Sequence, residues 1–316
     1  MAYSVGNTII DDDYNIFATG NASGTPNTGV RNINTIWGSG TATYGYGQST
    51  TVPAVSAGST ITATQWATLL TRMTSIANHQ GTSITAIGNP SAGATISAYT
   101  ALDSNITTLF GTSRFRAAGS GADSSDTNST TATWAATASL VKTFTWSSVD
   151  TMRYFFNSGG MLRFSWSRSG GSASPQNTSW TNLLSAAGTI TLTSDATSKV
   201  IAGVTYTGTN KIGGSGSPST LRTDIGEQQL STSNQTLFAQ TGSTYLYTSN
   251  TINMLVKTVS NVITVTTNLA DAASPAGGDV VNGTLSQIST VRYPSTTYIA
   301  NTWGTVTRNA PSWTTS

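Results

Sequence analysis

The residue types that carry most catalytic and metal chemistry are scarce in this chain. Glutamate occurs once, at Glu227, histidine once, at His79, and cysteine not at all. Without cysteine there is no disulfide framework and no thiolate ligand for zinc or an iron–sulfur cluster. Because general acid–base catalysis needs positioned titratable side chains, the composition favours a protein that is not an enzyme and that carries no catalytic residue.

The acidic and basic candidates each have a structural interpretation. Asp11-Asp12-Asp13 offers oxygen ligands for calcium but lacks the alternating spacing of an EF-hand. A carboxylate cluster at a helix start explains this run, and we expect no metal there, with calcium as an open alternative. His79 ends a predicted helix, a favourable place for a cation. A glycosidase needs two carboxylates across one bond, and no spacing identifies such a pair.

Other ligand classes lack their signatures as well. The glycine-rich stretches lack the Gly-Lys-Ser/Thr ending of a phosphate loop and the context of a dinucleotide site, so we expect no cofactor. A formal net charge of +2 gives no electrostatic footprint for nucleic acid. Nowhere do 18 apolar residues run together, and residues 1–10 lack a secretory signal. We therefore expect neither nucleic-acid binding, nor membrane insertion, nor export by a signal peptide.

The first third of the chain has helical spacing. Residues 61–81 place their apolar side chains on one stripe at 3.6-residue intervals, with Thr62 and Gln65 as a capping box and Gly81 as the stop. A second helix is predicted over residues 97–110. A third begins near Asp11, is interrupted by the turn-rich residues 20–29 and resumes through Trp37.

The pattern changes beyond residue 112. Residues 117–133 contain Gly, Ser, Ala, Asp, Thr and Asn with almost nothing to bury, which predicts a linker or a long surface loop. From Trp134 onward, alternation predicts strands, including a hairpin of residues 149–156 and 161–168, and a short helix begins at Thr178. Ser260-Asn261 is expected to form a tight turn. Further strands are expected at 188–193, 199–206, 244–248, 252–259, 262–267 and 284–293.

These patterns predict an α+β chain, mainly β, in three stretches. Residues 1–112 form a small helical, loop-rich module, residues 113–134 a linker or surface loop, and residues 135–316 an antiparallel β-sandwich of jelly-roll-like form. Charged residues are 8% of the chain, against about 25% in ordinary domains. Ser and Thr supply about a third, so the surface is expected to present hydroxyls, a surface suited to repeated subunit contacts.

Motifs in both halves resemble those of virion structural and tail-fibre-like proteins of tailed bacteriophages, especially contractile-tailed phages of cyanobacteria. The resemblance covers residues 10–112 and 145–193, and residues 20–29 look like an insertion. In the front half its motifs are Asp13-Tyr14-Asn15, Trp37-Gly38-Ser39-Gly40, Gly45-Tyr46-Gly47-Gln48, Ile61-Thr62-Ala63 before Trp66, and His79-Gln80-Gly81. In the back half they are Arg153 to Gly160, Leu162-Arg163-Phe164-Ser165 and Asn177 to Leu184.

The resemblance implies a non-enzymatic virion protein, a short tail fibre or a baseplate or tail component, assembled in the host cytoplasm. Residues 1–112 would attach it to other proteins of the tail or baseplate, and three copies of the chain would assemble into a homotrimer. The alternatives are a neck or capsid decoration protein, or an adhesin that binds host surface polysaccharide through the indole faces of Trp303 and Trp313. The interface candidates are Tyr44, Tyr46, Gln48, Trp66, His79 and Gln80.

Overall fold

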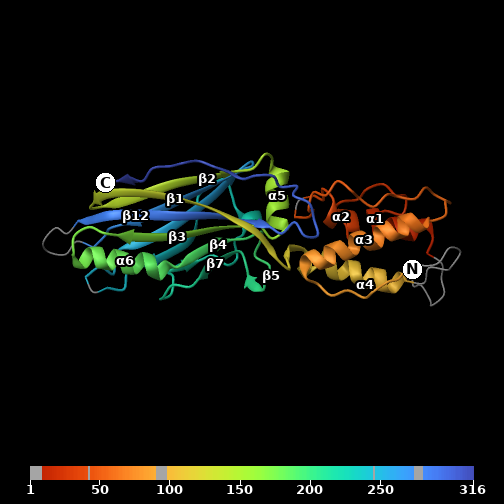
Figure 1. The fold of residues 1–316 in the computed structure, drawn as a ribbon, viewed down its shortest axis with the longest axis horizontal. Helices are drawn as coiled ribbons and strands as arrows, with labels where there is room; N and C mark the ends of the chain where they lie inside the picture. The colour runs from red at the N-terminus through yellow and green to blue at the C-terminus, as the bar shows by residue number, and fades with distance from the viewer. Residues whose placement is uncertain (1–8, 42, 90–97, 245, 274–279) are drawn as a thin grey trace.

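Two parts of the chain lie end to end along the long axis of the molecule (Figure 1). This computed structural model describes residues 9–41, 43–89, 98–244, 246–273 and 280–316. Helices form one end and antiparallel sheets the other, with one short helix between them. The predicted class, α+β and mainly β, is confirmed.

The helical part contains the helices that the sequence predicts: α1 (Asp11–Thr19), α2 (Ile33–Trp37), α3 (Ala63–Gln80) and α4 (Tyr99–Phe110). The apolar stripe of α3 is buried, and the side chains of Thr62 and Gln65 each accept the other's backbone N–H. Gly81 ends this helix in the left-handed conformation, as expected for a C-terminal glycine.

Carboxamide side chains hold the long loops of the helical part. The amide of Asn15 donates to the carbonyl oxygen of Val55 and accepts its N–H, both at 2.8 Å. Asn34 pairs with Val52 in the same two-way manner, at 2.9 and 2.7 Å. Each carboxamide therefore replaces a backbone partner that an irregular loop would otherwise lack.

The β part consists of two sheets and a small hairpin among the described residues. One sheet has the strand order β1-β12-β3-β4-β7, the other β13-β2-β11-β10-β9-β8 with β14 also paired to β2, and β5 pairs with β6. The strands of the first sheet are β1 (Ser120–Trp134), β3 (Met161–Ser169), β4 (Thr189–Leu192), β7 (Thr209–Ile212) and β12 (Val281–Pro294). Those of the second are β2 (Thr137–Thr145), β8 (Thr220–Leu221), β9 (Gln235–Thr241), β10 (Thr251–Val259), β11 (Val262–Ala270), β13 (Thr307–Arg308) and β14 (Thr314–Thr315).

The sheets pack face to face through large side chains. Trp166 of β3 stacks on Phe238 of β9 with ring centroids 6.1 Å apart, and Phe144 of β2 meets Phe164 of β3 edge to face. Helix α6 (Pro175–Ala187) packs against strands of both sheets and buries Trp180 against Trp134. Helix α5 (Val149–Asn157) lies at the end of the sandwich that faces the helical part (Figure 1).

The linker predicted over residues 113–134 is wrong. A 3-10 turn (Thr112–Phe115) leads into the 15-residue strand β1, which pairs with β12 along its length. Most of its outward side chains are hydroxyls, and several bond across the ladder, as between Ser129 and Ser286 at 2.8 Å or Thr131 and Thr284 at 2.9 Å. A strand held by such polar pairs has no apolar alternation for a sequence pattern to detect.

Three other expectations need correction. Residues 149–156 form helix α5 rather than half of a hairpin. The segment 199–206 is two strands, β5 (Lys199–Ile201) and β6 (Val204–Tyr206), because Ala202 and Gly203 both have positive φ. The described residues of 244–248 form no strand, and the N–H of Tyr247 donates to the carbonyl oxygen of Thr244 at 2.9 Å. The turn at Ser260-Asn261 is confirmed, with φ of +56° at Ser260.

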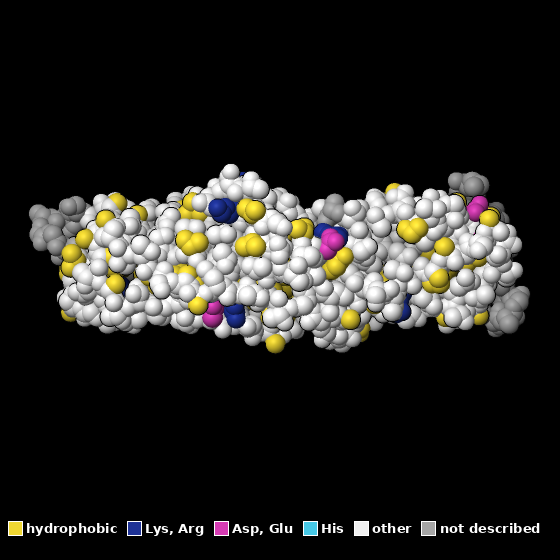
Figure 2. All heavy atoms as spheres, turned by 90° about the horizontal axis from the view of Figure 1, so that it is seen from above, with side chains coloured by type: hydrophobic (Ala, Val, Ile, Leu, Met, Phe, Trp, Pro, Cys, Tyr) yellow, Lys and Arg dark blue, Asp and Glu magenta, His cyan; other side chains and the backbone are white. Residues whose placement is uncertain are grey.

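Charged side chains are sparse on the face seen in Figure 2, where most of the surface is uncharged. Several of the charges pair locally, such as Arg292 with Asp123 at 2.8 Å and Arg222 with Asp224 at 2.7 Å. Within the described part of the chain, no helix combines the length and apolar character needed to cross a membrane.

Candidate functional site at the junction of the two parts

The loop that contains residues 38–41 and 43–48 joins the helical part to the sandwich. Backbone bonds fix it to α2, since the N–H groups of Tyr46 and Gln48 donate to Ile36 and Trp37 at 2.9 Å. Gly45 and Gly47 have φ of +103° and +72°. A Cβ atom at Gly47 would lie 2.4 Å from the ring of Tyr154 on α5, so only glycine lets this loop approach the sandwich so closely.

Side chains of α5 bind the carbonyl groups of this loop. Arg153 donates to the carbonyl oxygens of Tyr44 and of Ser39, the latter at 2.8 Å. The amide of Asn157 donates to the carbonyl oxygen of Gly45 at 3.1 Å. Charged donors make stronger hydrogen bonds than neutral ones, so Arg153 is the principal polar clamp between the two parts.

Tyr46 connects three segments of the junction. Its hydroxyl donates to the carbonyl oxygen of Arg114 at 2.9 Å and accepts from the side chain of Gln80 at 3.0 Å. Gln80 also donates to the carbonyl oxygen of Leu109 at 3.1 Å. Burial raises the pKa of the Tyr46 hydroxyl, so this group is a neutral donor and acceptor.

Gln48 reaches the far end of the sequence. Its amide donates to the carbonyl oxygen of Ala300 at 3.0 Å and accepts the N–H of Ala300 at 2.9 Å. The hydroxyl of Thr302 donates to the carbonyl oxygen of Tyr46 at 2.5 Å. The segment around residue 300 is therefore tied to the helical part as well as to the sandwich.

His79 lies buried at the end of α3, against the sandwich. Its Nε2 atom is 3.2 Å from the carbonyl oxygen of Ser158, and its ring meets that of Tyr46 edge to face at 5.1 Å. Burial lowers the pKa of His79 to about 4, although the bond to Ser158 opposes the shift. A neutral imidazole that donates to a carbonyl explains this histidine without catalysis.

The six predicted interface residues separate into two sets. Tyr46, Gln48, His79 and Gln80 meet at the junction, and Tyr44 lies beside it, stacked on Phe110 with centroids 4.5 Å apart. Trp66 is buried in the core of the helical part, 13 residues before His79 on α3, or about 20 Å along the helix axis.

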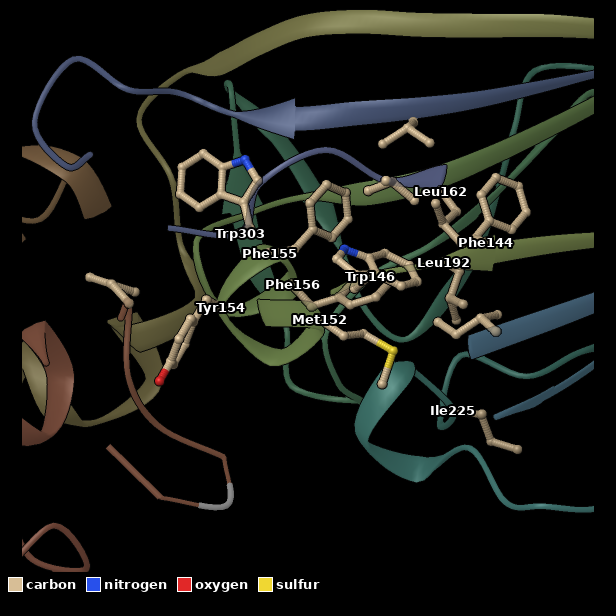
Figure 3. Close-up of a cluster of buried hydrophobic side chains, with 14 of the residues drawn as sticks. Phe144, Trp146, Met152, Tyr154, Phe155, Phe156, Leu162, Leu192, Ile225 and Trp303 are labelled. Atoms are coloured by element: carbon tan, nitrogen blue, oxygen red, sulfur yellow. The ribbon is translucent and has the colours of Figure 1, made fainter. Parts of the chain in front are cut away.

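The predicted exposure of Trp303 and Trp313 is wrong. Trp303 is 1% exposed and belongs to the same buried cluster as Phe155 (Figure 3). Trp313 is 8% exposed, and its indole N–H donates to the carbonyl oxygen of Asn128 at 2.9 Å. Indole faces that are covered in this way are not available to stack on a sugar ring.

The acidic run at residues 11–13 begins α1, as the helix interpretation expects. Asp13 is buried and accepts the N–H of Ile10 at 3.3 Å, and Asp11 accepts the N–H of Gly58 at 2.8 Å. The described residues contain no group of three or more His, Cys, Asp or Glu side chains arranged to hold a metal ion.

Sequence analysis missed Arg153, Asn157 and Glu227 as junction residues. Glu227 is 8% exposed, on the 3-10 turn Glu227–Gln229, and its neighbour Gln228 donates to the side chain of Asn157 at 3.2 Å. The sequence does contain one signal for the helix that carries two of these residues. Ser148 is the N-cap of α5 and forms a capping box with Thr151, three residues later.

The junction is densely packed rather than hollow. The cavity under the loop, lined by Ile36, Tyr46 and Arg114 among others, has a volume of about 10 Å³. A space of that size holds at most one water molecule. The side chains of the junction therefore fill the space between the two parts, and their hydrogen bonds fix one part to the other.

Glu227 and His79 give the junction a specific pH dependence. Burial raises the pKa of Glu227 to about 7 from 4.5, so the stability that its neutral form provides is complete below pH 4.5 and lost as pH rises through 7. Burial of His79 makes stability depend on pH in the opposite direction. The stability that the neutral imidazole provides is complete above pH 6.5 and is lost as pH falls through 4. Each of these two groups changes the free energy of unfolding by about 3 kcal/mol over its pH range.

We expect Glu227→Gln to remove the contribution of Glu227 to the pH dependence of stability and to leave that of His79. Between pH 4.5 and 6.5 the contributions of Glu227 and His79 change in opposite directions, so their sum in the wild-type chain is nearly constant there. The free energy of unfolding of the variant, measured with urea, should gain on that of the wild type by about 3 kcal/mol between pH 4.5 and 7. A difference that does not change with pH over this range would contradict the assignment.

Comparison with protein-family models, with curated proteins and with solved structures finds no match to this chain.

Proposed function

We propose that this chain is a non-enzymatic structural protein of a phage virion, a short tail fibre or a baseplate or tail component. The observation that carries the proposal is the closed junction: an elongated, two-part molecule is held end to end by Arg153, Tyr46 and Gln48. The motifs that resemble tail-fibre-like proteins supply much of this junction. Residues 45–48 and 79–81 bind the segment 153–160, which carries the corresponding motif of the back half.

The surface supports the same proposal. A charge-poor surface with many hydroxyls is suited to many weak contacts in a repeating assembly. On this account the helical part docks onto other tail or baseplate proteins in the host cytoplasm, and the sandwich, for which a jelly-roll-like topology stays a prediction, projects outward. Neck or capsid decoration and polysaccharide binding stay as alternatives, the latter without the two tryptophans that suggested it.

The homotrimer is part of this proposal and has its own test. Light scattering coupled to gel filtration, at micromolar concentration, should give three times the 32.7 kDa mass of the chain. A species with the mass of one chain would contradict the trimer and leave the virion assignment to be tested separately.

A suppressible stop codon in the gene, within the phage that encodes the chain, tests the virion role. Growth in a host without the suppressor should yield particles that lack the chain and that fail in tail completion or infection. Suppression by the original amino acid should restore both properties. Purified wild-type particles that contain no trace of the chain by mass spectrometry would contradict the proposal.

A further inference from the structure

A buried lysine bridges the two sheets of the sandwich. Lys142 of β2 is 0% exposed, and its Nζ atom is 3.2 Å from the side-chain oxygen of Asn128 on β1. The same Nζ atom contacts the carboxylate of Asp126, also on β1, and the carbonyl oxygen of Asn309. An amine, a carboxamide and a carboxylate therefore meet at one point between neighbouring edges of the two sheets.

The strand pattern explains how these groups meet. Lys142 occupies an inward position of β2 between Leu140 and Phe144, where alternation would place an apolar side chain. Asp126 and Asn128 are two residues apart on β1, so both side chains point to the same inward face. Arg308 of β13 approaches the other oxygen of Asp126 at 3.4 Å.

We propose that Lys142 and Asn128 form an intramolecular isopeptide bond, with Asp126 as the proton acceptor. Asp126 takes a proton from the ammonium group of Lys142, which leaves a neutral amine, the nucleophilic form of lysine. The amine attacks the amide carbon of Asn128, one bond beyond the oxygen that it already contacts. The C–N bond to the side-chain nitrogen of Asn128 breaks, ammonia leaves with the transferred protons, and a new amide joins the two side chains.

The reaction needs no other reactant. One amide is exchanged for another, so nothing is oxidised or reduced. The folded chain holds amine, amide and carboxylate in contact, which replaces an encounter in solution by an intramolecular step. Asp126 then carries a proton that it can donate to the leaving nitrogen, as a general acid.

The other fully buried lysine provides a useful contrast. Lys199 is also 0% exposed at its side chain and pairs with Asp195 at 2.8 Å. Its remaining hydrogen bonds go to the carbonyl oxygen of Asp195 and the hydroxyl of Thr193, so the described contacts of this lysine include a carboxylate but no carboxamide. It has a base but no amide to attack, and we expect it to stay unmodified.

The intact mass of the full-length purified chain, measured under denaturing conditions, tests the bond. We expect the mass of the sequence less one ammonia molecule. Cleavage by chymotrypsin after Trp134 and Leu140 should leave the fragments that contain Asn128 and Lys142 joined as one branched peptide. Lys142→Arg, Asn128→Ala and Asp126→Ala should each restore the full mass, whereas the control Lys257→Arg, on the outer face of β10, should keep the loss.

Several outcomes would overturn the proposal, and the first does not depend on any variant. A wild-type chain with the full mass of its sequence would rule out the bond. Loss of water in place of ammonia, with the branch at Asp126, would show that the carboxylate is the acceptor and not the base. Ammonia loss that persists in Lys142→Arg would assign it to a different asparagine.

Discussion

Replacing Gly47 with alanine is expected to lower the free energy of unfolding by about 3 kcal/mol. The backbone there has φ of +72°, which costs a residue with a Cβ atom about 1–2 kcal/mol. The new Cβ atom would also lie 2.4 Å from the ring of Tyr154, and relief of that overlap adds about 1–3 kcal/mol. Urea unfolding followed by tryptophan fluorescence measures the sum.

Gly58→Ala is the matched control for this variant. Gly58 has nearly the same φ, +75°, but a Cβ atom there has no neighbour within 4 Å. The difference between the two variants therefore isolates the contact between the loop and α5, and we expect about 1–3 kcal/mol. Equal destabilisation by both would mean that the approach of Gly47 to Tyr154 does not constrain the junction.

We expect Trp303→Ala to lower the free energy of unfolding by about 3–5 kcal/mol, which is more than the loss expected for Gly47→Ala. The indole is 1% exposed and belongs to the buried cluster that also contains Phe155 of α5, so its removal leaves a cavity in that core (Figure 3). Thermal unfolding by circular dichroism gives the size of the loss.

Tyr298→Ala serves as the comparison for Trp303→Ala, because Tyr298 is 45% exposed on the same segment of chain. We expect it to change stability by no more than about 0.5 kcal/mol. If Trp303→Ala kept full stability and lost only binding to host polysaccharide, the tryptophan would be a surface contact and its place in the core would be contradicted.

The helical part was the more predictable half of the fold. Helix α3 has an apolar stripe, a capping pair and a terminal glycine, and these local signals all agree. The prediction for the segment of helix α5 was wrong because its aromatic run, Tyr154 to Phe156, also suits a strand. Burial of Phe155 and Phe156 against Trp146, together with the cap at Ser148, favours the helix.

Strand β1 could not be predicted because its stability comes from a distant partner. Its inward residues include Asp126 and Asn128, which are acceptable in a half-buried position because distant residues, Lys142 and Arg308 among them, pair with them. Its outward hydroxyls are satisfied by β12, more than 150 residues away for the pair of Thr131 and Thr284. Composition alone therefore could not distinguish this strand from a loop.

The candidate site was predicted from one side only. Short motifs identified Tyr46, Gln48, His79 and Gln80 as contact residues, but not what they contact. Their partners, Arg114, Ser158 and Ala300, lie 68 to 252 residues away in the sequence and contribute backbone carbonyl groups. Side-chain patterns carry no information about a carbonyl group that a distant loop will present.

Cryo-electron microscopy of the intact phage particle tests the central claim most directly. The account predicts density in the tail or baseplate that fits this elongated chain as one unit, with the helical part against neighbouring virion proteins and the sandwich pointing away. Particles with complete tails in which no density fits the chain would contradict it.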